Sequence, residues 1–432
     1  MRYWLLVLVP VLAACTGGLL HGRPESGVRG RPALQVRFDS ASASASLTWG
    51  RAPDAGFVRY EVQRSQGPGF SVLGVIEDPA DTAFTDSGLR ADIPYTYRVV
   101  TYMEAAGRRR ASPGQAASGR IHPFVGSWQV EGAPRFLPTR LVVDGSGVLW
   151  VVGAGSGRLA RFDRSGQALP AIVFSEQPLA CLETAGLDGP ALDVDARGCV
   201  HLAYSVQTPE GTIASFWSCY DAAGRLVWSR PLGGLFPRHL VVGPADRVFI
   251  ESISQLQEFD RGGKRRAQHA VPALLVSSLR FWAGKFAVLV EPLQLVDGGW
   301  QAPRLAVYEQ ADRRSASLVI GRDPASEEDL GNGVLQRPTD FVVDEGSRRA
   351  FVVNAGAQRL EVFRDQEYLT RLGEAGSGPG QFSFSGTARV VENLQEATFA
   401  SRPVVAGGIT RDQDGSLYVA DTFNNRIQKF GP

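Results

Sequence analysis

A four-strand pattern that recurs from residue 124 onward constrains the fold more than any other feature of the sequence. Each copy has a strand, a short turn rich in Asp and Gly, a second apolar strand, a variable loop, a third strand that ends in an aromatic residue, and another short turn. Four-stranded repeats of roughly 40 to 50 residues are typical of β-propeller blades. The sequence therefore predicts an all-β chain with six blades in residues 122–432. Three copies are clear and three are weaker, and they begin at or near Pro138, Pro338, Gly408, Pro190, Pro237 and Val276.

The last copy lacks a fourth strand, because it stops after the strand that ends at Phe430. The segment Phe124–Val130 precedes the first copy and has the character of a strand. An unpaired blade edge would offer its backbone groups to other chains. We therefore expect residues 124–130 to supply the outer strand of the last blade and to close the ring.

The last copy also carries three short motifs: Gly408-Ile-Thr-Arg-Asp412, Leu417-Tyr-Val-Ala-Asp421 and Asn424-Asn-Arg-Ile-Gln-Lys-Phe430. They resemble the NHL repeat, and the resemblance implies a six-bladed β-propeller of the NHL or TolB-like type. Propellers of this type mostly present loops to proteins or other polymers. Related six-bladed propellers include a copper- and zinc-dependent lyase and metal-dependent lactonases.

Residues 33–121 form a separate unit of short runs that alternate between apolar and polar side chains, as half-buried strands do. Trp49 lies in one such run, and Leu89 is followed by Pro94-Tyr-Thr-Tyr-Arg-Val99. This order resembles a fibronectin type III domain, a β-sandwich with a core Trp on its second strand. The resemblance implies that Tyr95 is the tyrosine-corner residue.

The N-terminus has the pattern of an export signal. Arg2 is followed by an apolar stretch, Tyr3–Leu12, that is too short to span a bilayer and ends in Leu12-Ala-Ala-Cys15. This ending resembles a bacterial lipobox. The resemblance implies that residues 1–14 are removed, that Cys15 is lipidated, and that the chain is anchored to a membrane. Because Thr16 is not the Asp that retains many diderm lipoproteins at the inner membrane, the outer membrane is the expected location in a diderm cell.

Residues 15–32 are rich in Gly, Pro and Arg and are expected to be a flexible tether. The chain has 45 Lys and Arg against 44 Asp and Glu, so it lacks the basic excess of most nucleic-acid-binding proteins. We expect no nucleic-acid partner.

The two faces of the predicted propeller differ in loop length. The first and third turns of each blade are short, whereas the middle and inter-blade loops include residues 175–189, 291–303, 322–337 and 376–407. Binding sites usually lie on variable loops that a rigid scaffold carries. We therefore expect an envelope or extracellular protein to bind the long-loop face, with the N-terminal domain on the opposite side. Trp300, Glu291 and Asp297 are the candidate contact residues.

An enzyme with a site in the central channel is the alternative to a protein-binding scaffold. Metal-dependent propeller enzymes need several His or carboxylate ligands that converge on the channel. The five His residues occupy no matching positions in successive blades, so we predict no catalytic residue, metal or cofactor. Cys199 and Cys219 flank one predicted hairpin and form the candidate disulfide.

Overall fold

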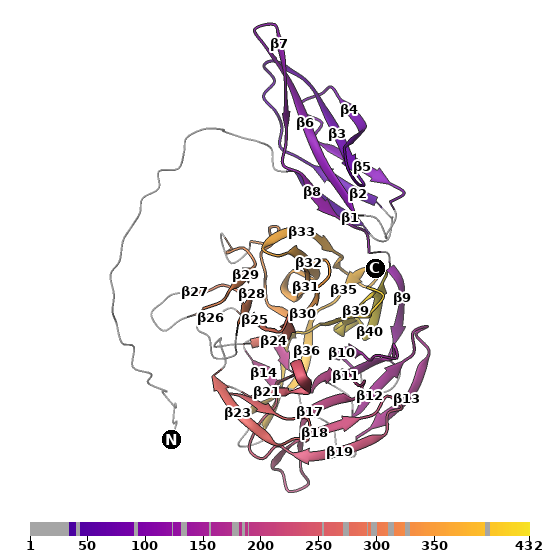
Figure 1. Ribbon diagram of the computed structural model, residues 1–432, viewed down its shortest axis with the longest axis vertical. Helices are drawn as coiled ribbons and strands as arrows, with labels where there is room; N and C mark the ends of the chain where they lie inside the picture. The colour runs from indigo at the N-terminus through magenta and orange to yellow at the C-terminus, as the bar shows by residue number, and fades with distance from the viewer. Residues whose placement is uncertain are drawn as a thin grey trace, which may run out of the picture.

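The computed structural model describes residues 34–432 except 40–43, 90–93, 123, 131–135, 155–156, 175–180, 184–185, 189, 253–254, 271–275, 292, 295–299, 310–314, 325–328 and 394–397. The predicted signal, the tether, Cys15 and Asp297 therefore lie outside the described residues. Regular structure in the described part is almost entirely β-strand, as the alternating patterns predict. Figure 1 shows a sandwich at one end of the molecule and a ring of blades at the other.

The N-terminal unit is a sandwich of two antiparallel sheets with the order β1-β2-β5 and β4-β3-β6-β7, and β8 pairs with the free part of β6. Its core contains Trp49, Tyr60, Tyr95 and Tyr97, which are all buried. The Trp49 and Tyr60 rings meet edge to face with 5.5 Å between centroids. Its strands are β1 (Gln35–Asp39), β2 (Ser44–Thr48), β3 (Phe57–Ser65), β4 (Ser71–Ile76), β5 (Ala83–Ser87), β6 (Tyr95–Ala105), β7 (Arg108–Pro113) and β8 (Ala117–Gly119).

Six four-stranded antiparallel sheets follow and form the blades of a propeller. Blades 1 to 3 are β10 (Pro138–Val143), β11 (Leu149–Gly153), β12 (Arg158–Phe162), β13 (Ala168–Val173); β16 (Ala191–Val194), β17 (Val200–Gln207), β18 (Ile213–Tyr220), β19 (Leu226–Pro231); and β20 (His239–Val242), β21 (Val248–Ser252), β22 (Gln255–Phe259), β23 (Arg265–Ala270). Blades 4 and 5 are β24 (Val276–Trp282), β25 (Lys285–Val290), β28 (Arg304–Tyr308), β29 (Leu318–Ile320); and β30 (Pro338–Asp344), β31 (Arg349–Asn354), β32 (Arg359–Arg364), β33 (Glu367–Leu372). The three weaker repeats thus correspond to blades 2, 3 and 4.

Blade 6 is built from both ends of the propeller sequence. It consists of β38 (Gly408–Arg411), β39 (Leu417–Asp421), β40 (Arg426–Phe430) and β9 (Phe124–Gln129). β9 pairs antiparallel with β40, with Arg426 opposite Gln129 and Phe430 opposite Phe124. The segment that the sequence predicts as the closing strand therefore occupies this position. The inner strands β10, β16, β20, β24, β30 and β38 contact one another in a closed ring.

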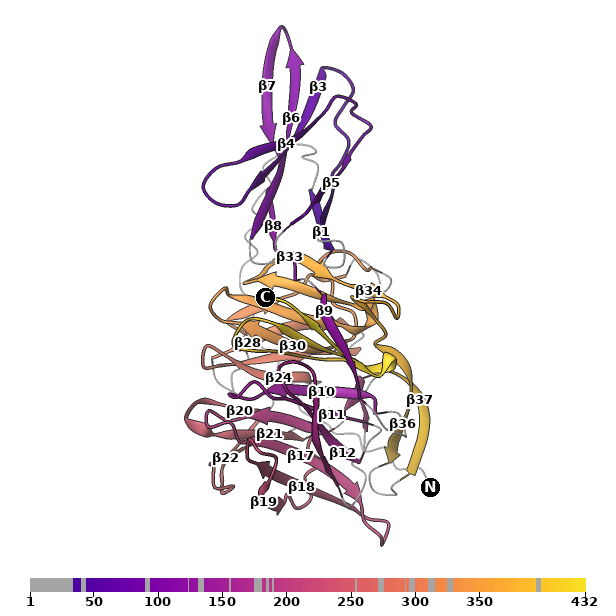
Figure 2. The same ribbon diagram turned by 90° about the vertical axis from the view of Figure 1, so that its right-hand side faces the viewer.

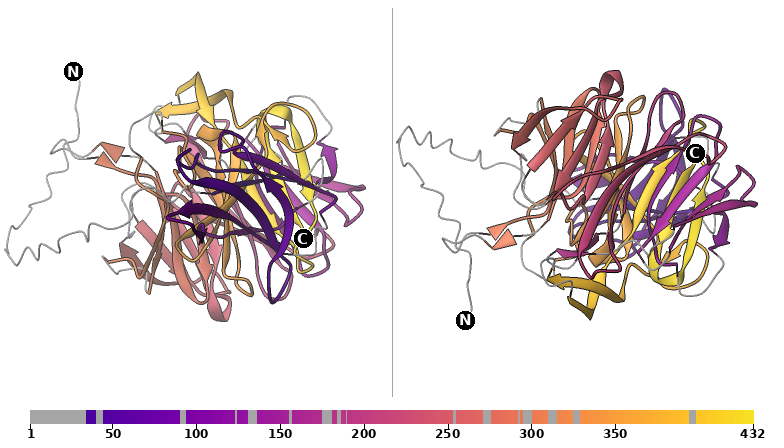
Figure 3. Two further views of the ribbon diagram at one scale, coloured as in Figure 1. Left: turned by 90° about the horizontal axis from the view of Figure 1, so that it is seen from above. Right: turned by 90° about the horizontal axis from the view of Figure 1, so that it is seen from below.

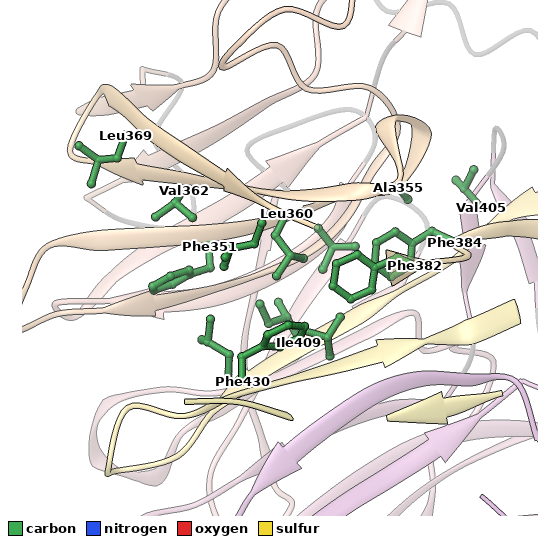
Figure 4. Close-up of a cluster of buried hydrophobic side chains, with 14 residues drawn as sticks. Phe351, Ala355, Leu360, Val362, Leu369, Phe382, Phe384, Val405, Ile409 and Phe430 are labelled. Atoms are coloured by element: carbon green, nitrogen blue, oxygen red, sulfur yellow. The ribbon is translucent and has the colours of Figure 1, made fainter. Parts of the chain in front are cut away.

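The hydrophobic core of the propeller lies between successive blades. Figure 4 shows the cluster between blades 5 and 6, in which Phe351, Leu360 and Val362 of blade 5 face Ile409 and Phe430 of blade 6. Phe382 and Phe384 of the connecting segment stack on each other with a centroid distance of 4.9 Å. Burial of these apolar faces between blades holds neighbouring sheets together.

The sandwich packs against the side of blade 5. β1 and β8 lie over β33, and Arg37 of β1 pairs with Glu374 at 2.7 Å. Only part of β33 remains exposed, whereas the outer strands β13, β19 and β23 are largely exposed. The chain enters β9 at its short-turn end, as expected, but the sandwich itself lies beside the outer strand of blade 5 and not over the short turns. The link from β8 to β9 is short, and it holds the sandwich beside the rim at blades 5 and 6 (Figures 1 and 2).

Candidate functional site

The short turns of the propeller are fixed by aspartates at the ends of strands. Asp144 Oδ1 accepts the N–H groups of Ser146 and Val148 at 2.9 and 3.0 Å. Asp163, Asp221 and Asp412 accept N–H groups in the same way. Because these Asx-type turns need only four residues, the loops on this face of the propeller are short and similar to one another.

The opposite, long-loop face carries two hairpins that pair with each other. β14 (Cys181–Glu183) and β15 (Gly186–Asp188) come from the connection between blades 1 and 2, whereas β36 (Ser385–Asn393) and β37 (Thr398–Val405) come from the connection between blades 5 and 6. The four strands form one closed sheet, here called the hairpin cap. β36 and β37 stand outside the stack of blades in Figure 2.

The hairpin cap is anchored on the blades by an apolar cluster. Ala388, Val390 and Val404 pack with Phe423 of the middle loop in blade 6 and with Ala154 of blade 1. Gly386 lies so close to the Phe423 ring that a Cβ atom would be 2.2 Å from Cδ1. The cap is therefore packed on the propeller and has a defined position on this face.

Repeated arginines hold the inter-blade loops on the same face. Arg426 Nε donates to Asp421 at 2.7 Å, and its other nitrogens donate to the carbonyl oxygens of Ser377, Gly378 and Gln381. The corresponding residue of blade 5, Arg359, bonds Glu361 at 2.6 Å and the carbonyl oxygen of Leu330 at 2.7 Å. The motif arginines thus fix the long loops to the rigid sheets.

A third hairpin extends the middle loop of blade 4. It consists of β26 (Leu293–Gln294) and β27 (Trp300–Gln301), and it projects from the body of the propeller (Figure 3). Trp300 lies in β27 and so stands on the long-loop face, as expected from its loop, but its side chain is outside the described part.

Charged and polar residues from several blades meet at the long-loop end of the propeller axis. The group, here called the axial cluster, comprises Arg140, Arg238, His239, Glu251, Ser277 and Glu291. All six are at the start of an inner strand or the end of a second strand, and both of these positions face the long loops. All except Arg140 are buried.

Arg140 of blade 1 reaches across the axis of the ring. Its guanidinium donates to the carbonyl oxygen of Thr339 in blade 5 at 3.1 Å and to that of Ser277 in blade 4 at 2.9 Å. It also lies 3.3 Å from His239 Nε2 in blade 3. Blades on opposite sides of the ring are thus joined through one side chain, which crosses the axis on the long-loop side.

His239 and Glu251 form a buried pair within blade 3. The His239 Nδ1 to Glu251 Oε2 distance is 3.0 Å, and Arg238 lies 3.5 Å from the other carboxylate oxygen. Burial lowers the pKa of His239, although Glu251 opposes this shift. Burial alone would raise the pKa of Glu251, but His239 and Arg238 outweigh it, so the pKa lies below its ordinary value.

Glu291 is a buried carboxyl group of the axial cluster. Burial raises its pKa to about 7, and the positive charges of Arg238 and Arg140 limit the rise. A carboxyl group with this pKa exchanges a proton near neutral pH. The predicted contact residues are Trp300, Glu291 and Asp297, and the structure describes the side chain of Glu291 alone among them. Glu291 lies at the start of the long loop 291–303, beside the propeller axis.

A second layer of polar side chains fills the axis more deeply. Arg280 of blade 4 pairs with Asp340 of blade 5 at 3.0 Å and donates to the carbonyl oxygens of Phe341 and Ile409. Asp340 also accepts the N–H of Ile409 in blade 6. Asp193 of blade 2 accepts the N–H of Val242 in blade 3. These bonds connect neighbouring inner strands, so the second layer has a structural role.

Cys199 and Cys219 are adjacent free thiols in blade 2. A hydrogen bond between them affects the pKa of both, and burial raises that of Cys219 to about 12. A disulfide between them remains a prediction.

No group of three or more His, Cys, Asp or Glu in the described ranges is arranged to hold a metal ion. Among these same residues, no helix is long and apolar enough to cross a bilayer.

A comparison with models of protein families finds a match in the last blade. Residues 405–430 match the family model of the NHL repeat. This match covers the three motifs that the sequence indicates, so that resemblance is confirmed for blade 6. No curated protein matches the chain.

Several solved structures are similar at low identity. A protein of unknown function from Bacteroides thetaiotaomicron has a TM-score of 0.47 at 10% identity, with 94% of this chain and 99% of that chain covered. Virginiamycin B lyase from Staphylococcus aureus has a TM-score of 0.38 at 9% identity, with 71% and 98% covered. The PQQ-bound aldose sugar dehydrogenase from Streptomyces coelicolor has a TM-score of 0.40 at 10% identity, with 72% and 99% covered. Similarity at this level says nothing about activity.

Proposed function

We propose that this chain is an exported lipoprotein, anchored through lipid on Cys15, whose propeller binds an envelope or extracellular protein through its long-loop face. The observation that carries the proposal is the asymmetry of the two faces. One face has four-residue turns, whereas the other has a packed hairpin cap and loops fixed by Arg359 and Arg426. A rigid scaffold with elaborated loops on one face is the usual arrangement of a binding surface.

The axial contacts favour a binding surface over a deep catalytic pocket. Arg140 and Arg280 bond carbonyl groups and carboxylates of other blades, so the protein's own side chains occupy the axis. A partner would then contact the loops and the hairpin cap, which lie above these bonds.

The sandwich supports a role as a spacer between lipid and propeller. Its β1-β2-β5 and β4-β3-β6-β7 order agrees with a fibronectin type III domain, as does the burial of Trp49 and Tyr95. Its contact with β33 would keep both faces of the propeller clear of the sandwich.

Crosslinking of the membrane-extracted protein, followed by mass spectrometry, tests the partner. We expect one dominant envelope protein crosslinked through residues 291–303 or 376–407. Crosslinks confined to the sandwich would contradict the proposal.

Metabolic labelling with an alkyne fatty acid tests the anchor, and we expect Cys15→Ser to abolish the label. A label that persisted in this variant would refute lipidation at Cys15.

An enzyme with its site at the axial cluster is the second candidate, and the pKa of Glu291 favours it. Glu291 would transfer a proton, while Arg238 and Arg140 would stabilise the negative charge that develops on the carbonyl oxygen of a lactone. Turnover of lactone substrates that is lost in Glu291→Gln and kept in Glu210→Gln, an exposed loop variant, would support this candidate. No turnover across a lactone panel would count against it.

A further inference from the structure

A group of arginines lies where the link from the sandwich meets blades 5 and 6, on the short-turn side. Arg349 begins β31 and Arg364 ends β32, and the two are directly opposite each other in the register of blade 5. Arg411 of blade 6 lies 3.5 Å from Asp344, which is opposite Arg349 in the sheet. Arg120 of the link is also close, because its charge lowers the pKa of Arg349. We call these four residues the junction arginines.

Arg349 is the most deeply buried member of this group. Its side chain is 5% exposed, and its Nε is buried with no hydrogen-bond partner. Among the described residues, no carboxylate lies within ion-pair distance of it. A buried N–H group without an acceptor is costly, because burial removes its hydration and no hydrogen bond replaces it. Burial and the charges of Arg120 and Arg364 lower the pKa of Arg349 to about 10.

The nearby acidic and basic groups leave an excess of positive charge. Asp344 faces Arg349 in the register of β30 and β31, but it already accepts the Ser347 hydroxyl and lies 3.5 Å from Arg411. Arg348 pairs with Asp365 at 2.7 Å. Glu367 lies opposite Arg364 and is exposed.

His122 adds no charge to the junction. It is buried, its Nδ1 lies 3.1 Å from the carbonyl oxygen of Gly431, and its ring meets Phe351 edge to face. Burial and the arginines Arg120, Arg349 and Arg411 lower its pKa to about 3, so it is neutral at physiological pH. The positive charge therefore comes from guanidinium groups, which favour oxyanions and bind them with paired N–H donors.

We infer that the junction arginines form a binding site for a small oxyanion of the phosphate or sulfate class, with Arg349 as its buried donor and Arg364 as its more accessible one. The inference does not depend on the proposed partner of the long-loop face. An anion bound here would contact the link, blade 5 and blade 6 together. It would therefore stabilise the attachment of the sandwich to the propeller.

Titration of the full chain with inorganic phosphate, at constant ionic strength set with chloride, tests this site. Calorimetry measures binding, and the melting temperature gives a second readout. We expect saturable binding and a rise in melting temperature. Arg349→Met should weaken phosphate binding at least tenfold, while Arg348→Gln, the adjacent exposed arginine, should leave it unchanged.

Arg364→Gln provides a second variant if Arg349→Met fails to fold, because Arg364 is only half-buried. It too should weaken phosphate binding. The inference is refuted if neither phosphate nor sulfate binds in a saturable manner, or if Arg364→Gln and Arg348→Gln bind phosphate equally well.

Discussion

Closure of the ring by β9 predicts a specific role for Trp128. This side chain comes from the closing strand, and its ring lies 5.9 Å from that of Phe162 in blade 1 and 5.6 Å from that of Tyr418 in blade 6. It therefore joins the first and last blades across the closure. Gly166 has φ of +89°, and a Cβ atom there would lie 1.9 Å from Trp128 Nε1, so the contact is close.

The cost of Trp128→Ala can be worked from these contacts. Truncation of a fully buried Trp or Phe costs about 3–5 kcal/mol, and each aromatic pair adds about 0.5–1.5 kcal/mol beyond its buried area. Because Trp128 is only half-buried, we expect a loss of about 3 kcal/mol, the lower end of that range. With an unfolding entropy of about 2.1 cal/mol/K per residue over roughly 300 residues, the melting temperature should fall by about 5 °C.

Calorimetry of the full chain measures this shift, with Val125→Ala as the matched control. Val125 lies on the same strand and is 58% exposed, so its truncation should change stability by no more than about 0.5 kcal/mol. Equal melting temperatures for Trp128→Ala and Val125→Ala would refute the role of β9 in closure.

Three further predictions concern buried groups. Arg280, Arg140 and the Ile409 N–H outweigh the effect of burial on Asp340 and hold its pKa below the ordinary value. The stabilising contribution of Asp340 is thus present above the unfolded pKa of about 4 and is lost as the pH falls through the lower folded pKa. Asp340→Ala should lower the free energy of unfolding by about 3–5 kcal/mol at pH 7, as measured by urea unfolding. Burial raises the pKa of Glu291 to about 7, so its contribution is full below about pH 4.5 and is lost as the pH rises through 7. Glu291→Gln should remove this loss, so at pH 8 the free energy of unfolding of the variant should exceed that of the wild type by about 1–3 kcal/mol. If the free energies of unfolding of the two proteins depended on pH in the same way, the raised pKa of Glu291 would be contradicted. Cys199 and Cys219 should form a disulfide in exported protein, which peptide mapping without reduction detects, whereas full labelling of both by a thiol reagent would exclude it.

The blades could be predicted from the sequence because their signals are local. Strand alternation, Asp-containing turns and the repeat spacing act within one hairpin, so the inner strands of blades 4 and 5 begin at Val276 and Pro338 as predicted. The closing strand was also predictable, because a blade with three strands leaves an unpaired edge.

The site was harder to predict because its members are far apart in the sequence. Arg140 comes from blade 1, whereas Arg238 and Glu251 come from blade 3 and Glu291 follows a strand of blade 4. Only closure of the ring brings Arg140 near the other three. The pairing of β14 and β15 with β36 and β37 joins two loops about 200 residues apart, and neither loop carries a motif that indicates the other. The position of the sandwich against β33 also depends on surface contacts that have no repeat.

Site-specific photocrosslinking in cells tests the central claim, that the long-loop face binds a partner, most directly. A photoreactive residue replaces Arg389, which is exposed on β36 of the hairpin cap, and in a second strain it replaces Lys264, which is exposed in a short turn of blade 3. The account predicts one discrete crosslinked protein at position 389 and none at position 264. Crosslinking of the same protein only from position 264 would contradict it.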